Sequence, residues 1–331
     1  MIFVDGLPLP LSIASSPRRY RCRSLPLSHH PLGYRTLKSL LEHPSLVSAS
    51  DRLKAMPERK LSSVSEDSTA ERSVPPFKHV YVFQREYATV DPGLVELAGT
   101  DEATTCVGFV IRNRDSGMIS IAHLDSARVV DLGLDQMLSS LVHGEVGVLD
   151  VHLIGGFQDA PYSRSEQFHI KTLCVLGHNT KRDSHGNSFP IISGFLVDTS
   201  SGSVMPASFD RSSRCPDEIV RRVRVTVSSG DPRWKGKLMD TYDTSCDRFL
   251  IAPCSWSLGW APFASELLQL PDSEILSQCS TSPLAESPDF VDNERRVFNY
   301  LIENPGWRLT FYKGRPRIFE RAPSVGWTRR S

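Results

Sequence analysis

The sequence lacks the features that mark membrane, nucleic-acid-binding and disulfide-rich proteins. Among its 331 residues, no apolar run approaches the roughly 18 residues that a membrane span needs. The 38 basic residues are balanced by 38 acidic ones, so no basic surplus is present to attract nucleic acid. The seven cysteines form no CxxC pair, and the start shows no secretory signal pattern. We therefore expect a soluble protein with free thiols in a reducing compartment, without membrane or nucleic-acid partners.

The first 76 residues differ in composition from the rest of the chain. Residues 7–76 are rich in Ser, Pro and Arg and contain no long periodic segment, which predicts a poorly ordered segment. Residues 2–6 look like a short strand ending in a turn, so we assign 1–6 to the body of the protein. The basic excess before residue 39 is also found in organelle transit peptides. A discarded peptide would not need that strand, and we therefore expect no organelle targeting.

Residues 77–331 have the pattern of one packed domain. Two apolar β-branched runs, 106–112 and 118–123, flank the polar turn 113–117 and predict a hairpin. Further strands are expected at 80–83, 148–153, 170–176, 191–197, 203–207, 238–242 and 248–252, and helices at 134–142, 216–224, 272–278 and 289–303. Hairpin-linked strands with inserted helices predict an α+β fold with mostly antiparallel β-sheets, packed in a sandwich with helices.

The hairpin and the residues just before it carry the side chains best suited to catalysis. Cys106 begins its first strand, His123 ends its second, and Thr100 lies six residues before the thiol. A thiol, an imidazole and an orienting hydroxyl form the set required for covalent attack on a carbonyl. A neighbouring imidazolium would lower the pKa of the thiol and supply thiolate at cellular pH. The Thr100 hydroxyl could fold back to the ring and hold its orientation.

The pairing register of the hairpin decides whether Cys106 and His123 can lie on the same face of the sheet. If the turn pairs Arg112 with Met118, then Cys106 falls opposite Leu124 and His123 falls opposite Val107, so both lie at the same open end of the hairpin. A one-residue bulge would then be needed to bring the thiol and the ring onto one face.

Each of these residues also has an ordinary structural explanation. A single cysteine at the start of an apolar strand is more often a small buried hydrophobe than a nucleophile. His123 alone would more often be structural, and threonines near a turn usually bond to their own backbone. The residues by themselves leave the two interpretations about equally supported.

Four motifs resemble the protein N-terminal asparagine amidohydrolase family and favour the catalytic interpretation. They are Thr-Asp-Glu-Ala-Thr-Thr-Cys at 100–106, His-Leu-Asp at 123–125, Val-His-Leu-Ile-Gly-Gly at 151–156 and Ser-Thr-Ser-Pro-Leu-Ala-Glu at 280–286. The resemblance runs from about residue 78 to the C-terminus and includes the start at 2–6; residues 83–91 are similar to the plant members.

The resemblance implies a cysteine amidohydrolase that converts an N-terminal asparagine to aspartate and releases ammonia, upstream of arginylation in the N-degron pathway of protein degradation. It implies Cys106 as the nucleophile, with His123 and Thr100 as the other triad members, and no metal or organic cofactor. The implied fold is similar to that of bacterial glutamine deamidases and deamidating toxins. We expect a monomer in the cytoplasm, with the nucleus as a second compartment, acting on proteins and peptides with N-terminal Asn.

Substrate recognition calls for an acceptor of the free α-ammonium group. The carboxylates near the motifs are Asp101, Glu102 and Asp125, and the hydroxyls are Thr104, Thr105 and Ser282; we take all six as candidate substrate-binding residues. Two alternatives stay open: a catalytically silent protein that binds N-termini, and a related deamidase for another amide such as glutamine.

The chain departs from the expected family pattern at two places. Residues 15–33 look like extra basic, Pro-rich material, and residues 157–167 are shorter than the helix that a family member would carry there. Loss of a covering helix would expose apolar surface at about 25 cal/mol per Å². The departures therefore bear on stability rather than on the catalytic motifs.

Overall fold

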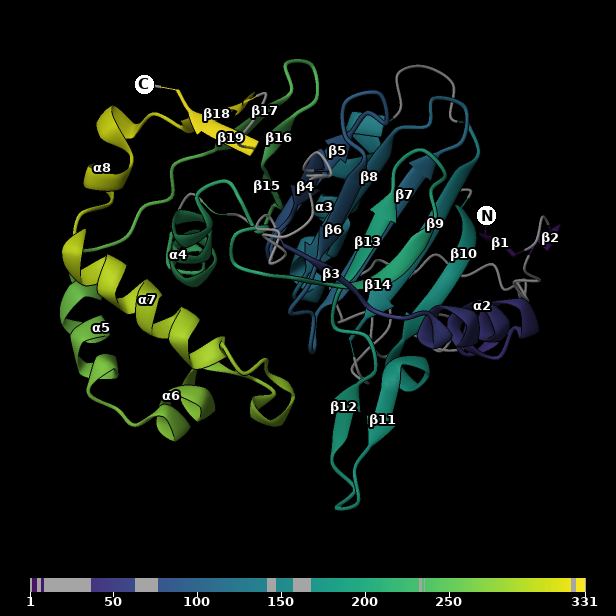
Figure 1. Ribbon diagram of the computed structural model, residues 1–331, viewed down its shortest axis with the longest axis horizontal. Helices are drawn as coiled ribbons and strands as arrows, with labels where there is room; N and C mark the ends of the chain where they lie inside the picture. Colours follow the sequence, from purple (N-terminus) through teal and green to yellow (C-terminus); the bar gives the residue numbers. More distant parts are fainter. Residues whose placement is uncertain are drawn as a thin grey trace, which may run out of the picture.

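The computed structural model describes residues 2–4, 7–8, 37–62, 77–141, 147–156, 168–231, 234, 236–322 and 326–330. The segments 15–33 and 157–167, where we expect departures from the family pattern, lie outside the described residues. The described parts form the α+β architecture that the sequence predicts, with two large sheets on one side and helices on the other (Figure 1).

The larger sheet has eight strands in the order β15-β5-β8-β7-β9-β10-β1-β2. Their bounds are β15 Met239–Asp240, β5 Glu86–Val90, β8 Ile119–Leu124, β7 Val107–Asn113, β9 Leu149–Gly155, β10 Phe168–Val175, β1 Ile2–Val4 and β2 Leu7–Pro8. The central strands β5, β8, β7 and β9 are antiparallel, whereas β15, β10 and β1 join by parallel pairing. The expected antiparallel centre is present, but the sheet as a whole is mixed.

The second sheet has five strands in the order β3-β14-β13-β6-β4. They are β3 Arg59–Leu61, β14 Val204–Phe209, β13 Phe195–Asp198, β6 Leu97–Thr100 and β4 His79–Tyr81. Antiparallel pairs again occupy the centre, and the edge strands β3 and β4 pair in parallel.

The two sheets pack against each other through a shared apolar core. Val110 and Ile121 of the larger sheet and Phe195 and Val197 of the smaller one belong to the same buried cluster. The closest approach is at Gly108 on β7, where an added Cβ would lie 2.0 Å from the ring of Phe195. A glycine at this position is therefore required for the sheets to come together.

Helices cover the outer faces and build the side of the molecule that carries the C-terminus (Figure 1). The helix α3, Ala127–Leu141, packs Met137 and Leu141 on the outer face of the larger sheet. The helix α4, Glu218–Ser228, lies between the smaller sheet and α7, Phe290–Glu303, and it shares the main core with α7. The other elements here are α5 Trp260–Leu268, α6 Asp272–Cys279, η3 Pro283–Ala285, α8 Trp307–Thr310, η4 Tyr312–Gly314 and the four-stranded sheet β16 Tyr242–Asp243, β17 Arg248–Ile251, β18 Arg317–Ala322 and β19 Gly326–Arg329.

A short helix and a β-hairpin extend from the larger sheet. The 3-10 helix η2, Leu176–Asn179, leads from the larger sheet into the hairpin β11 Thr180–Arg182 and β12 Ser188–Pro190, which projects from the body (Figure 1). No helix among the described residues is long and apolar enough to cross a membrane.

The described part of the first 76 residues is more ordered than its composition predicts. The helix α2, Pro44–Ala55, begins with a proline at its first turn and buries Leu46 and Leu53. The strand β3 follows and pairs with β14. For residues 44–61 the structure therefore differs from the expectation of a poorly ordered segment over 7–76, because two leucines seven residues apart suffice to dock a Ser-rich helix. The strand at 2–4 pairs with β10 and buries Val4.

A buried ion cluster joins α4 to the larger sheet. The carboxylate of Glu86 on β5 accepts hydrogen bonds from Arg221 at 2.6 Å and from Arg224 at 3.4 Å, and none of the three side chains has appreciable solvent exposure. Arg221 also donates to the carbonyl of Tyr81 at 2.5 Å. Because removing one partner leaves a buried charge uncompensated, this cluster fixes α4 against the strands that carry the candidate site.

Candidate active site

Cys106 lies at the end of a bend, residues 104–106, immediately before β7. The bend rests on Gly155 and Gly156 at the end of β9. Both glycines have positive φ, and a Cβ on Gly155 would lie 2.8 Å from the carbonyl oxygen of Cys106. The glycines of the motif at 151–156 therefore allow the close backbone approach that positions Cys106.

Thr100 and His123 form the hydrogen bond that the sequence predicts. The Oγ1 of Thr100, on β6, lies 2.8 Å from Nδ1 of His123, on β8, and both side chains are buried. The Nε2 of His123 is also buried and has no hydrogen-bond partner among the described residues. The ring is thus oriented through Nδ1, and Nε2 remains available for a proton transfer.

Cys106 and His123 line one cavity of about 420 Å³. In the observed register, His123 lies opposite Gly108 and Leu124 opposite Val107. Cys106 lies in the bend two residues before Gly108, and its side of the bend faces the cavity that His123 also lines. The predicted register was wrong by one residue. Asn113 rather than Arg112 pairs with Met118, so no bulge is needed.

Burial favours the neutral forms of both the thiol of Cys106 and the imidazole of His123. Burial, followed by the nearby negative charge of Asp125, raises the pKa of Cys106 to about 12. Burial lowers the pKa of His123 to about 4. Burial thus disfavours the expected thiolate–imidazolium pair, because it penalises the charged form of each group.

Asp101 is buried and fully engaged with its neighbours. It accepts hydrogen bonds from the hydroxyl of Tyr81 at 2.6 Å, from the backbone N–H of Phe209 at 2.8 Å and from Arg214 at 2.9 Å. These contacts anchor the chain between β6 and the bend.

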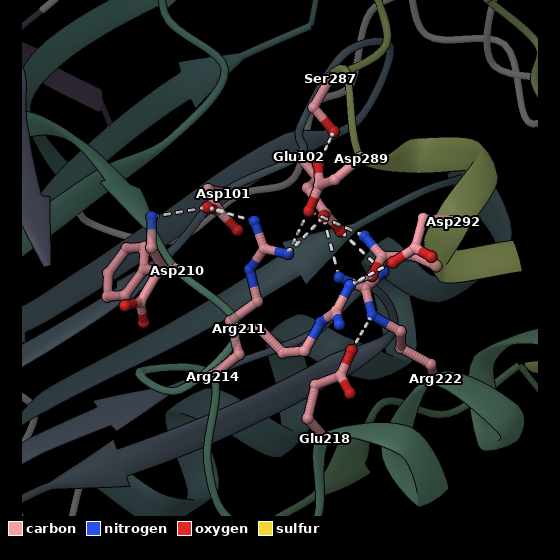
Figure 2. A network of polar contacts seen from close by, with 12 residues as sticks. Asp101, Glu102, Asp210, Arg211, Arg214, Glu218, Arg222, Ser287, Asp289 and Asp292 are labelled. Atoms are coloured by element: carbon pink, nitrogen blue, oxygen red, sulfur yellow. Dashed lines mark hydrogen bonds and ion pairs between the residues drawn. The ribbon is translucent and has the colours of Figure 1, made fainter. Parts of the chain in front are cut away.

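Glu102, with a positive φ of 59°, occupies the centre of an ion-pair network (Figure 2). Arg222 on α4 donates two hydrogen bonds to it, at 2.8 and 3.0 Å, and Arg214 approaches to 2.7 Å. Arg222 also donates to Glu218. The network ties the bend that carries Cys106 to α4.

Asp125 lines the cavity two residues after His123. Its Oδ2 accepts hydrogen bonds from Arg85 at 2.5 Å and from Gln84 at 3.0 Å, whereas its buried Oδ1 has no hydrogen-bond partner among the described residues. The backbone N–H of Arg85 donates to the carbonyl of His123 at 2.8 Å. Arg85 and Asp125 therefore hold the end of β8 in place.

The segment 280–286 packs over the bend through hydroxyl groups. Ser282 donates to Thr104 at 2.9 Å, and Thr105 lies 3.3 Å from Thr281, oxygen to oxygen. The three predicted hydroxyl residues, Thr104, Thr105 and Ser282, are thus brought together beside Cys106. Among the described residues, no group of three or more His, Cys, Asp or Glu side chains is placed to hold a metal ion.

Comparison with known proteins decides the family. Residues 69–329 match the model of the family described as protein N-terminal asparagine amidohydrolase. A protein of that name from Arabidopsis thaliana is 49% identical over 92% of this chain and 95% of its own length. The proteins of that name from Mus musculus and Homo sapiens are each 32% identical, over 75% and 71% of this chain and 85% and 78% of their own lengths. The chain belongs to the protein N-terminal asparagine amidohydrolase family.

The family match spans two cavity residues that sequence analysis did not select. Glu286 and Glu294 line the cavity together with Cys106 and His123. Glu286 is the last residue of the motif at 280–286, and its place in that motif could have identified it as a candidate from the sequence. Glu294 lies on α7, in a segment with no local motif, and only the fold brings it to the site.

Proposed function

We propose that this member of the N-terminal asparagine amidohydrolase family hydrolyses the side-chain amide of an asparagine at the N-terminus of a protein or peptide, giving aspartate and ammonia. The observation that carries the proposal is the hydrogen bond between Thr100 and His123 in the cavity that also holds Cys106. The whole-length similarity to proteins named for this reaction supports the choice of substrate.

The first step forms a thioester. With its Nδ1–H donating to Thr100, His123 presents Nε2 as an acceptor for the thiol proton of Cys106. The sulfur attacks the side-chain carboxamide carbon, and the C–N bond breaks after the imidazolium returns the proton to the departing amine. Ammonia leaves, and the acyl group remains on Cys106.

The second step hydrolyses the thioester. The same neutral imidazole takes a proton from water, the hydroxide attacks the acyl carbon, and the protonated ring returns a proton to the sulfur. The product is an N-terminal aspartate, and the free thiol is restored. No step in this scheme passes through a metal or an organic cofactor.

The other predicted residues shape the site around these steps. We assign the oxyanion formed during attack to the backbone N–H groups of Thr105 and Cys106 in the bend, because the N–H of Thr104 donates to the carbonyl of Glu102 and donors of this kind stabilise developing charge. Thr104, Thr105 and Ser282 hold the bend against the segment 280–286. Asp101 and Glu102 hold it against β14 and α4.

The finer expectations stay predictions. They are the likeness of the two packed sheets to bacterial glutamine deamidases and deamidating toxins, a place upstream of arginylation in the N-degron pathway, a monomeric state, and residence in the cytoplasm and nucleus.

Ammonia release from three matched peptides tests the proposal. The peptides begin with Asn, Gln and acetyl-Asn and are otherwise identical. We expect release from the Asn peptide alone, with Gln disfavoured because its extra methylene costs about 1–3 kcal/mol and moves the reacting carbon away from the thiol. The Cys106→Ala variant, shown to be folded by circular dichroism, should release none. A folded wild-type sample that binds the Asn peptide without releasing ammonia would point to a silent binding protein and overturn the proposal.

A further inference from the structure

The carboxylates of the cavity fall into two groups by their charge partners. Asp125 is paired with Arg85, and Glu102 is paired with Arg214 and Arg222. Glu286 and Glu294 line the same cavity and form no ion pair within the described chain. The acidic residues predicted from the sequence are thus compensated already, and those that the fold adds are not.

Of these two carboxylates, Glu294 has fewer hydrogen-bond partners. Glu286 accepts a hydrogen bond from the hydroxyl of Ser280 at 2.5 Å. Glu294, half-buried on the cavity side of α7 one turn beyond Phe290, receives no hydrogen bond from any described residue. A half-buried carboxylate without a donor is partly desolvated, and a cation that enters the cavity would offset the cost of that partial burial.

A second, independent observation also indicates a ligand with hydrogen-bond donors. The Oδ1 of Asp125 is buried at this cavity and has no hydrogen-bond partner in the described part of the chain, although Oδ2 of the same carboxylate has two. Because most buried polar atoms have a hydrogen-bond partner, this oxygen is free to accept a donor that a ligand brings into the cavity.

The substrate of the proposed reaction carries one cation close to its reacting carbon. The α-ammonium nitrogen of an N-terminal asparagine is three bonds from the side-chain amide carbon, hence at most about 4 Å away. A carboxylate on the wall of the cavity that holds Cys106 is suitably placed to receive it, and an ionic hydrogen bond in a half-buried site is stronger than a neutral one.

We propose that Glu294, supported by Glu286, accepts the α-ammonium group of the substrate and thereby selects N-terminal asparagine over internal asparagine. This assignment rests on the proposed function. It moves the task of amine recognition from Asp101 and Glu102, which serve the bend, to the helix α7 on the opposite wall.

The ionisation of Glu294 links this role to pH. Burial, together with the like charges of Glu102 and Glu286 and against the opposing charge of Arg222, raises the pKa of Glu294 to about 7. The carboxylate is therefore present above pH 7 and is lost as the pH falls below it. The α-ammonium is lost above a pKa of about 7.7–8.0. The value of kcat/KM for a free-amine peptide should rise through pH 7 and fall again above pH 8.

A substrate cycle tests the assignment. The wild type, Glu294→Gln and the control Glu303→Gln, an exposed glutamate at the end of the same helix, are assayed with two peptides. One begins with Asn, and the other is its deamino analogue, with hydrogen in place of the α-amine. We expect Glu294→Gln to lower kcat/KM for the Asn peptide by about 10- to 100-fold, the range for one ionic hydrogen bond, and to leave the deamino analogue unchanged. Glu303→Gln should match the wild type on both.

Two results would overturn the assignment. One is a Glu294→Gln variant that keeps the wild-type preference for the free amine and the rise in kcat/KM through pH 7. The other is an equal loss on both peptides, which would show a structural role. Calorimetry of the Cys106→Ala protein with both peptides measures amine recognition without turnover. If the wild type releases no ammonia at all, the proposed function fails, and the calorimetric preference for the free amine, with and without Glu294→Gln, still decides the role of Glu294.

Discussion

Thr100 and His123 meet across the two sheets of the molecule, with Oγ1 of the threonine 2.8 Å from Nδ1 of the histidine. Thr100 ends β6 of the five-stranded sheet, and His123 lies near the end of β8 of the eight-stranded sheet. The orientation of the His123 imidazole therefore depends on how the sheets pack, and the bond links the stability of the fold to the geometry of the candidate site.

Removing the Thr100 hydroxyl should impair turnover without unfolding the protein. Thr100→Val keeps the shape of the side chain but leaves Nδ1 of His123 without its partner, so the ring loses its preferred tautomer and orientation. We expect kcat to fall by about 10- to 100-fold, a typical range for a misplaced general base. Thr100→Ser retains the hydroxyl and should keep most of the rate. Equal rates for the Val and Ser variants would contradict the role of the hydroxyl.

The reactivity of Cys106 should report its resting protonation state. Because its pKa is raised to about 12, the thiolate fraction grows about tenfold per pH unit throughout pH 6–9. Iodoacetamide labelling of the peptide that contains Cys106, followed by mass spectrometry, should rise accordingly, with exposed Cys246 as the internal reference. A pH-independent labelling rate below pH 7 would instead indicate a resting thiolate–imidazolium pair.

An alanine at Gly108 should disturb both stability and activity. Its Cβ would lie 2.0 Å from the ring of Phe195, so the sheets would have to separate or Phe195 would have to move. We expect a loss of about 1–3 kcal/mol in the free energy of unfolding, as for other overpacked cores. Gly177→Ala is the matched control, because nothing lies within 4 Å of the added atom. Urea unfolding of both variants makes the comparison, and similar midpoints would refute the close approach.

Glu86→Gln should be among the most destabilising changes outside the cavity. It would leave the buried guanidinium groups of Arg221 and Arg224 without their carboxylate. The expected loss is about 3–5 kcal/mol. Glu320→Gln breaks ion pairs to Arg248 and Arg330 on the surface and should cost less than about 1 kcal/mol. Equal unfolding midpoints for the two variants would show that the buried cluster contributes little.

Local sequence patterns were sufficient to predict the elements that carry Cys106 and His123. The apolar runs on either side of 113–117 predict the hairpin, and the structure places β7 and β8 there. The register differs by one residue because the side chain of Asn113 accepts hydrogen bonds from the N–H groups of Asp115 and Ser116, which shortens the turn and extends β7. Such a side-chain contact has no counterpart in apolar periodicity.

Local sequence patterns could not predict that a residue of α7 lines the cavity. Glu294 is separated from Cys106 by most of the domain, and nothing in the residues around it distinguishes it from a surface glutamate of an amphipathic helix. Its proposed role follows from the lack of a direct ion pair among the described residues, which only the three-dimensional arrangement of Arg85, Arg214 and Arg222 discloses. The helix α5 was missed for a simpler reason: Pro262 lies in its first turn and interrupts the pattern.

The placement of Thr100 and His123 on different sheets has a consequence for a newly made chain. A folding intermediate in which only the hairpin has formed would hold the thiol and the imidazole but not the hydroxyl that orients the ring. The imidazole would then be held in its observed orientation only once β6 and β8, which belong to different sheets, have been brought together.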